Sequence, residues 1–183
     1  GVLSVLSIFL YAFVYTPMKR KSPIAVFIGA FPGAFPPLIG YFASFNEPRI
    51  SWIPVILFLI QFVWQFPHFW AIAWVLDEDY KRAGFRLLPT TKQDKTSAII
   101  TLLSTIILVP VSLMPTVYLM PDGQAFGGNI YLVIALLAGF YFTWKAILLY
   151  KNKDVLSAKN LMYTSFIYLP LLQLTLLFDF IAK

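Results

Sequence analysis

Three consecutive acidic residues, Asp77, Glu78 and Asp79, are followed almost at once by two bases, Lys81 and Arg82. Mg²⁺ takes few carboxylate ligands in proteins and completes its coordination with water and substrate phosphates. A lysine and an arginine beside such carboxylates can bind the same phosphates through charge-assisted hydrogen bonds. The pattern indicates a metal and phosphate site in which the three acids are candidate ligands. Ordinary charge at a membrane surface is the alternative, and composition alone favours it.

A set of polar residues in the preceding apolar segment bears on that choice. Their spacing of three or four residues places them on one face of a helix. Polar side chains at membrane depth are costly and normally face the protein interior or a cavity. The spacing therefore predicts a polar stripe that leads from the acidic loop into the membrane. The residues on this face are Gln61, Gln65, His68, Ile72, Val75 and Asp79.

His68 is the only histidine, and it follows Pro67, which leaves the carbonyl of Val63 without its helical donor. Three roles stay open for the imidazole. It can be a structural group bonded to that carbonyl or to a neighbouring helix, a proton-transfer group, or an axial contact to a heme iron.

Aromatic residues make up 18% of the chain and several stand beside the polar stripe. Packing and anchoring at the membrane interface explain most of them. A few could line a tunnel for a prenyl chain or shield a carbocation by cation–π attraction. The residues concerned are Trp64, Phe66, Phe69, Trp70 and Trp74.

The elements that position these residues are membrane-spanning helices. Of the 183 residues, 60% are hydrophobic and 12% are charged, more apolar surface than a soluble domain of this size can bury. Continuous apolar runs of this length predict an all-α, polytopic transmembrane bundle of six helices. There are no cysteines, which excludes disulfides and thiolate metal sites. The apolar segments are 2–15, 24–43, 52–76, 98–120, 130–150 and 161–181.

The basic residues alternate from loop to loop. Loops 17–23, 77–95 and 151–160 are rich in lysine and arginine, whereas loops 44–51 and 121–129 contain Arg49 alone. The positive-inside rule places the three basic loops in the cytoplasm and both chain ends outside. The net charge of +6 is therefore a sign of topology, and no nucleic-acid partner is expected. On this reading Lys19, Arg20 and Lys21 serve first as topology signals.

Prolines and glycines alternate within segment 24–43. Pro32, Pro36 and Pro37 each remove a backbone donor, so the helix should kink or break. Gly29 and Gly33 offer a surface for close approach of another helix. A kinked packing helix and an opened ligand cavity are both consistent with this pattern.

Several short motifs, in order along nearly the whole chain, resemble the heme O synthase (protoheme farnesyltransferase) family of UbiA-type intramembrane prenyltransferases. The block from Pro-His-Phe-Trp to Leu-Pro is the most specific of them. The motifs are Tyr15-Thr16, Lys19-Arg20, the Gly-Ala-Phe-Pro-Pro-Leu-Ile-Gly run at 33–40, Pro67-His68-Phe69-Trp70-Ala71, Asp79-Tyr80, Arg82-Ala83-Gly84, Leu88-Pro89, Ala158-Lys159 and Tyr168-Leu169-Pro170.

The resemblance implies a nine-helix fold with two acidic motifs on cytoplasmic loops. Residues 1–183 would then be one transmembrane prenyltransferase domain, truncated at its N-terminus, that contains helices four to nine. The first acidic motif is absent, so this piece alone is expected to be inactive. The second departs from the superfamily pattern Asp-x-x-x-Asp, because Ala83 stands four residues after Asp79. Asp79 is the first choice for the Mg²⁺ ligand.

The resemblance also implies the reaction, in which the farnesyl group of farnesyl diphosphate is transferred to a vinyl group of heme b with Mg²⁺ as cofactor. The expected location is a bacterial inner membrane, and heme A synthase is the expected downstream partner. The implied catalytic residues are Asp79, Asp77 and His68, and the implied metal ligands are Asp77, Asp79 and Glu78. The implied substrate-binding residues are Lys19, Arg20, Lys81, Arg82, Tyr80, Gln65 and Trp64.

Two other kinds of function remain as alternatives. A related prenyltransferase could use the same metal chemistry on an aromatic quinone precursor. A transporter or a heme carrier would consume no farnesyl diphosphate, and a transporter would be expected to carry ionisable groups near mid-membrane.

Overall fold

The computed structural model describes residues 1–44 and 51–182, and nearly all of its regular structure is helical. Within these residues the only β feature is an isolated bridge between Leu119 and Ala125. The predicted all-α class is therefore confirmed. The helices are α1 (Val2–Phe9), the π-helix η1 (Leu10–Tyr15), α2 (Thr16–Met18), α3 (Ile24–Ala34), α4 (Pro36–Ala43), α5 (Ile53–Val75), α6 (Asp77–Arg82), α7 (Lys95–Val117), α8 (Asn129–Asn152) and α9 (Val155–Ile181).

Five helical segments in the described residues are long and apolar enough to cross a membrane. They are the broken helix α3–α4, spanning Ile24–Ala43, and the continuous helices α5, α7, α8 and α9. The first apolar segment, Val2–Met18, is also helical but shorter. The chain is therefore an integral, multi-pass membrane protein, as its hydropathy predicts.

Two helices begin earlier in the chain than hydropathy predicts. The carboxylate of Asp94 accepts a hydrogen bond from the Ser97 N–H at 2.8 Å, so α7 begins at Lys95 instead of 98. The carboxylate of Asp154 accepts one from the Ser157 N–H at 2.7 Å, so α9 begins at Val155 instead of 161. Both are N-caps, which define a helix start inside a polar segment that hydropathy interprets as loop.

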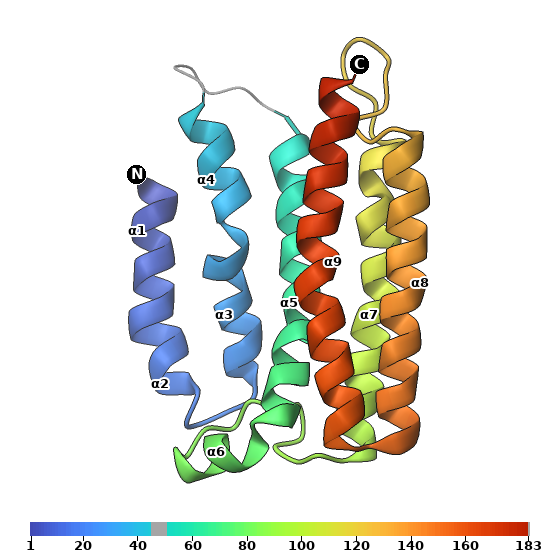
Figure 1. The fold of residues 1–183 in the computed structure, drawn as a ribbon. Helices are drawn as coiled ribbons and strands as arrows, with labels where there is room; N and C mark the ends of the chain where they lie inside the picture. The colour runs from blue at the N-terminus through green and yellow to red at the C-terminus, as the bar shows by residue number, and fades with distance from the viewer. Residues whose placement is uncertain (45–50, 183) are drawn as a thin grey trace.

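The three basic segments lie at the same end of the bundle (Figure 1). The turn after α2, helix α6 and the turn between α8 and α9 all lie at the lower end, and both chain termini lie at the upper end. This is the alternation that the charge pattern predicts. Arg49 lies outside the described residues.

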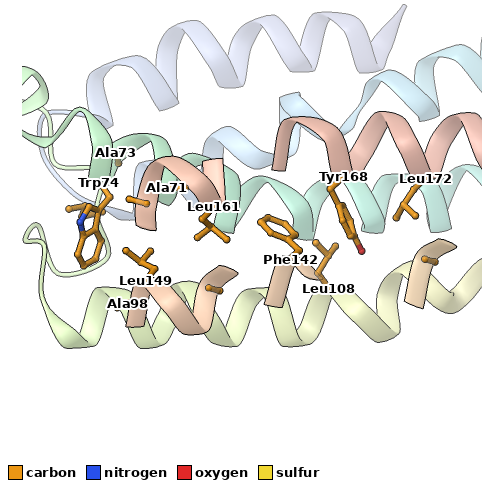
Figure 2. Close-up of a cluster of buried hydrophobic side chains, with 14 of the residues drawn as sticks. Ala71, Ala73, Trp74, Ala98, Leu108, Phe142, Leu149, Leu161, Tyr168 and Leu172 are labelled. Carbon is orange, nitrogen blue, oxygen red and sulfur yellow. The ribbon is translucent and has the colours of Figure 1, made fainter. Parts of the chain in front are cut away.

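The core lies among α5, α7, α8 and α9. Figure 2 shows large side chains from all four helices meeting there, among them Trp74, Leu108, Phe142 and Tyr168, each at most 2% exposed. In contrast, α1 and η1 pack on α3 and contain no buried residue. The bundle therefore has a compact half, α5 with α7–α9, and a looser half, α1 to α4.

The predicted break in segment 24–43 is confirmed. α3 ends at Ala34 and α4 begins at Pro36, with Phe35 between them. Pro36 and Pro37 have no N–H, so the carbonyls of Pro32 and Gly33 lack their helical donors.

Candidate functional site

Two polar clusters that the sequence places in separate loops meet at the basic end of the bundle. The backbone N–H of Arg86, after α6, donates to the carbonyl of Lys19 at 2.8 Å. The Lys19 ammonium lies 4.9 Å from the ring centre of Tyr15 and 5.2 Å from that of Phe85. These contacts hold the turn after α2 against the loop after α6.

Helix α6 carries the acidic triplet. α5 ends where Leu76 leaves helical geometry, and α6 then begins at Asp77 with three acids in its first turn and two bases in its last, an order that complements the helix dipole. Asp77 is buried and accepts from the Lys81 ammonium at 2.6 Å. The side chains of Glu78 and Asp79 are 88% and 69% exposed, and the Arg82 guanidinium lies 3.8 and 3.9 Å from them.

The acidic triplet can supply only part of a metal site. Nowhere in residues 1–44 and 51–182 do three acidic, histidine or cysteine side chains converge to surround a cation. Asp77 is paired with Lys81, which leaves Glu78 and Asp79 with exposed oxygens. One or two carboxylates fit Mg²⁺ when phosphates and water supply its other ligands. The metal assignment stays a prediction.

Tyr80 occupies the buried side of α6. Its ring is half-buried, packs against the core and lies 6.0 Å from that of Phe85. This burial raises the pKa of Tyr80 above its ordinary value, because a charged phenolate is disfavoured there. Tyr80 therefore anchors α6 and can also donate a hydrogen bond.

A cavity of about 470 Å³ lies between the first helical segment, α3 and α5. Gly29 and Gly33 face it, and both are sites of close approach, as predicted. A β-carbon on Gly29 would lie 2.8 Å from the Tyr15 ring, and one on Gly33 would overlap the Gln65 amide. The lining residues are Ser7, Ile8, Tyr11, Ala12, Tyr15, Val26, Gly29, Pro32, Gly33, Gln65 and Phe69.

Polar side chains satisfy the backbone around this cavity. Gln61 donates from Nε2 to the carbonyl of Gly33 at 2.7 Å, and Gln65 donates to that of Ala30 at 3.0 Å. Ser7 Oγ lies 3.5 Å from the carbonyl of Pro32. The carbonyls of Gly33 and Pro32 are the two that the proline pair deprives of donors, so the helix break depends on α5 and α1 for its hydrogen bonds.

His68 faces α9, whereas Gln61 and Gln65 face α3. Its Nδ1 lies 2.7 Å from Oγ of Ser165 in α9. That hydroxyl donates to the carbonyl of Met162 at 2.6 Å, so it accepts from His68. The imidazole is thus assigned the Nδ1–H tautomer, which leaves Nε2 as an acceptor. Of the structural roles considered for His68, the bond to a neighbouring helix is the one observed.

Trp64, like His68, faces α9. Its ring stacks on His68 with centres 4.3 Å apart, and its Nε1 donates to the Ser165 carbonyl at 2.9 Å. Neither Trp64 nor His68 is among the residues that line the cavity. The predicted continuous polar stripe is therefore wrong: Gln61 and Gln65 turn to α3, His68 turns to α9, and α5 ends before Asp79.

A second hollow of about 480 Å³ lies at the basic end, and it is lined in part by Lys19, Arg20 and Lys21. Phe85 also lines it, and Ala12 lines both this hollow and the apolar cavity. An apolar space is therefore adjacent to a cationic one. This pairing suits a ligand with a long apolar chain and an anionic head.

Sequence reasoning missed several residues of this region, among them Ser7, Tyr11 and Phe85. Ser7 and Tyr11 lie within an apolar run whose inward side is not readable without the position of α3. Phe85 stands next to a recognisable motif, but its contact with Lys19 crosses 66 residues of chain and has no local signal.

Fold and site together define a polytopic membrane protein in which an apolar cavity adjoins a hollow lined by basic residues. The sequence profile of the UbiA prenyltransferase family matches residues 1–169. The chain belongs to the UbiA prenyltransferase family. No solved structure matches it.

Curated relatives bear the name protoheme IX farnesyltransferase. The chain is 48% identical to the one from Cytophaga hutchinsonii over 179 residues, which cover 97% of this chain and 60% of that protein. It is 44% identical to the one from Flavobacterium psychrophilum (98% and 58% covered) and 36% identical to the one from Aquifex aeolicus (99% and 59% covered). The chain thus spans about three-fifths of the length of these relatives.

Proposed function

We propose that the protein transfers the farnesyl group of farnesyl diphosphate to a vinyl group of heme b, forming heme O. The observation that carries the proposal is the apolar cavity that shares Ala12 with a hollow lined by three cationic residues. A prenyl chain fits the first space and a diphosphate fits the second. The name of the relatives supports both the donor and the acceptor.

The basic residues bind anionic groups in this proposal. Lys19 and Arg20 hold the diphosphate or the heme propionates, because guanidinium and ammonium groups pair well with both. Arg82 and Lys81 approach the same ligand from α6, where Asp77 fixes the Lys81 ammonium. Asp79 and Glu78 would supply carboxylates to Mg²⁺, and the bound ion would neutralise charge on the diphosphate.

The cavity keeps bulk water away from the allylic carbon until the new carbon–carbon bond has formed. The bond between farnesyl C1 and oxygen breaks with its electron pair going to diphosphate, and the vinyl group attacks the allylic carbon. Water then adds to the resulting heme-side cation and loses a proton. The Tyr11, Tyr15 and Phe69 rings lining the cavity can stabilise positive charge by cation–π attraction, and Gln65 can orient a polar group of the substrate.

His68 is a weaker candidate for catalysis than the acids. Nε2 is the available acceptor, but the ring faces α9 and not the cavity. We propose that His68 takes up a proton only if the acceptor heme approaches along α5 and α9. A His68→Ala variant with unchanged turnover and heme affinity would remove it from the site.

The deciding experiment incubates membranes containing the protein, expressed from its native gene, with heme b, farnesyl diphosphate and Mg²⁺. Mass analysis should find farnesylated hydroxyethyl heme, and Asp79→Asn should abolish it. Asp122→Asn, an exposed acid of the opposite end, is the matched control and should leave the yield unchanged. Unmodified heme from folded protein would refute the heme acceptor.

The same preparation separates the alternatives. Prenylation of 4-hydroxybenzoate in place of heme would indicate a quinone-precursor enzyme. Heme binding without consumption of farnesyl diphosphate would indicate a carrier, and solute flux without Mg²⁺ in vesicles would indicate a transporter. We place the protein in a bacterial inner membrane with its basic end on the cytoplasmic side. Heme A synthase would receive the product.

A further inference from the structure

A groove separate from the proposed active site runs along the outward face of α8 and α9. Its volume is about 360 Å³, and it shares no lining residue with the cavity beside α3. Leu137 from α8 and Ile167 from α9 line it and are 63% and 66% exposed. The groove therefore lies on the outer side of the bundle that the described residues form.

The two ends of the groove differ in chemistry. Lys145 of α8 and Asn160 of α9 line the end nearer the basic loops, and Ile134 and Leu171 line the other end. At ~1.5 Å per residue, Lys145 lies about 10 Å along α8 from Asn152. Leu137 lies about 12 Å deeper again by the same measure. The groove thus extends from the level of the lipid headgroups toward the middle of the membrane.

Among the described residues, no ion pair balances the charge of Lys145. The described residues provide no carboxylate partner for it, and its ammonium lies 4.9 Å from the ring centre of Tyr141 and 4.7 Å from that of Trp144. Asp154, the acid that follows α8 in the chain, caps α9. A half-buried ammonium at this depth is costly unless an anion pairs with it. The anion that a membrane supplies at this level is a lipid phosphate.

A third groove on the bundle has no such charge among its described lining residues. That groove, of about 330 Å³, lies near the opposite end of the bundle and includes Leu57 and Phe126 in its lining. Its lining, as far as the described residues show, contains no charged side chain. An apolar groove alone selects no headgroup, whereas the α8–α9 groove combines an apolar channel with a cation.

We propose that the α8–α9 groove binds one anionic phospholipid, with its phosphate at Lys145 and Asn160 and an acyl chain along Leu137 and Ile167. The cation–π contacts with Tyr141 and Trp144 hold the ammonium in place before the lipid arrives. The site is independent of the reaction proposed above, because none of its residues lines the cavity or the basic hollow.

The test is native mass spectrometry of the delipidated protein, expressed from its native gene, titrated with phosphatidylglycerol and with phosphatidylcholine. The protein should bind phosphatidylglycerol about five-fold more tightly, and Lys145→Gln should remove that preference. Lys145→Arg should keep it. Lys151→Gln, which removes the same charge outside the groove, should change the affinity by less than about two-fold.

Several outcomes would overturn the proposal. Equal affinity for the two lipids, or an equal loss in Lys145→Gln and Lys151→Gln, would mean only diffuse attraction to a basic surface. Displacement of the lipid by farnesyl diphosphate would assign the groove to that substrate. A dimer that dissociates on Leu137→Trp would make the groove an interface between copies. Helical circular dichroism of each variant shows that folding is retained.

Discussion

The two halves of the bundle are built differently, although both are made of apolar helices. In the compact half, α5 and α7–α9 are long, and large side chains interlock between them. In the looser half, α1, η1 and α4 bury none of their residues, prolines interrupt the helix α3–α4, and the cavity lies against α5. Among the described residues, the compact half therefore holds the main apolar core, and the looser half lines the cavity of the proposed site.

Shortening a buried side chain of the compact half should have the largest effect on stability. Leu108 is 1% exposed in the compact half, so Leu108→Ala should lower the free energy of unfolding by about 2–5 kcal/mol because it leaves a cavity. Ile8→Ala in α1, where the side chain is 67% exposed, should change it little. Unfolding of both variants in detergent, followed by circular dichroism, checks this. If both variants lost the same free energy of unfolding, the two halves would not differ in their contribution to stability.

Filling the cavity wall should affect activity more than stability. In Gly33→Ala, the new methyl group overlaps the Gln65 amide and must displace it, at a cost of about 1–3 kcal/mol. Farnesyl transfer should fall by about ten-fold or more in kcat/KM if that cost is expressed in the transition state. Gly40→Ala is the control, since a β-carbon there meets nothing within 4 Å. Unchanged kinetics in Gly33→Ala would separate this wall from the reaction.

Removing the Gln61 amide, which donates to the carbonyl of Gly33 at the helix break, should have an intermediate effect on local stability. Gln61→Leu leaves the half-buried carbonyl of Gly33 without a donor, which should cost at most the roughly 1–3 kcal/mol of a fully buried unsatisfied acceptor. Gln61→Glu keeps the shape of the side chain, but only its protonated carboxyl group can donate to the carbonyl of Gly33. Hydrogen exchange should therefore speed up at α3 and α4 in the leucine variant and stay unchanged at α8. Uniform exchange across both halves would contradict a local role.

The smallest effect is expected at the cap of α7. Hydrogen bonds from Ser97 lower the pKa of Asp94, so its contribution is complete above the pKa of the unfolded chain and is lost as pH falls through the folded value. Asp94→Ala should cost about 1 kcal/mol near neutral pH. The difference from the parent protein should vanish in strong acid, as thermal melts across pH can show. A cost that persists in acid would exclude the charged cap.

Hydropathy and charge predicted the helices and their alternation because both depend on local composition. The break at Phe35 was also local, since Pro36 and Pro37 act on their own backbone. Helix starts were less accurate, because the caps at Asp94 and Asp154 depend on single hydrogen bonds.

The site was predictable only in part. The acidic triplet and the Lys19–Arg20 pair are short motifs, and the structure brings their loops together. Helical spacing placed Gln65 and His68 on one face, but a face wide enough to hold both contacts two neighbours, α3 and α9. Which neighbour each side chain reaches depends on the packing of helices far apart in the chain.

The bonds around the proline break also bear on the order in which the protein is made. Ser7 precedes the break in the chain, so its hydroxyl is present when α3 and α4 enter the membrane. Gln61 follows the break and arrives only with α5, after the loop that joins them. Until then the carbonyl of Gly33 is exposed to lipid, where an unpaired polar group costs several kcal/mol. The broken helix α3–α4 thus obtains one of its hydrogen bonds from a helix that follows it in the chain, so the wall of the cavity is complete only after α5 has inserted.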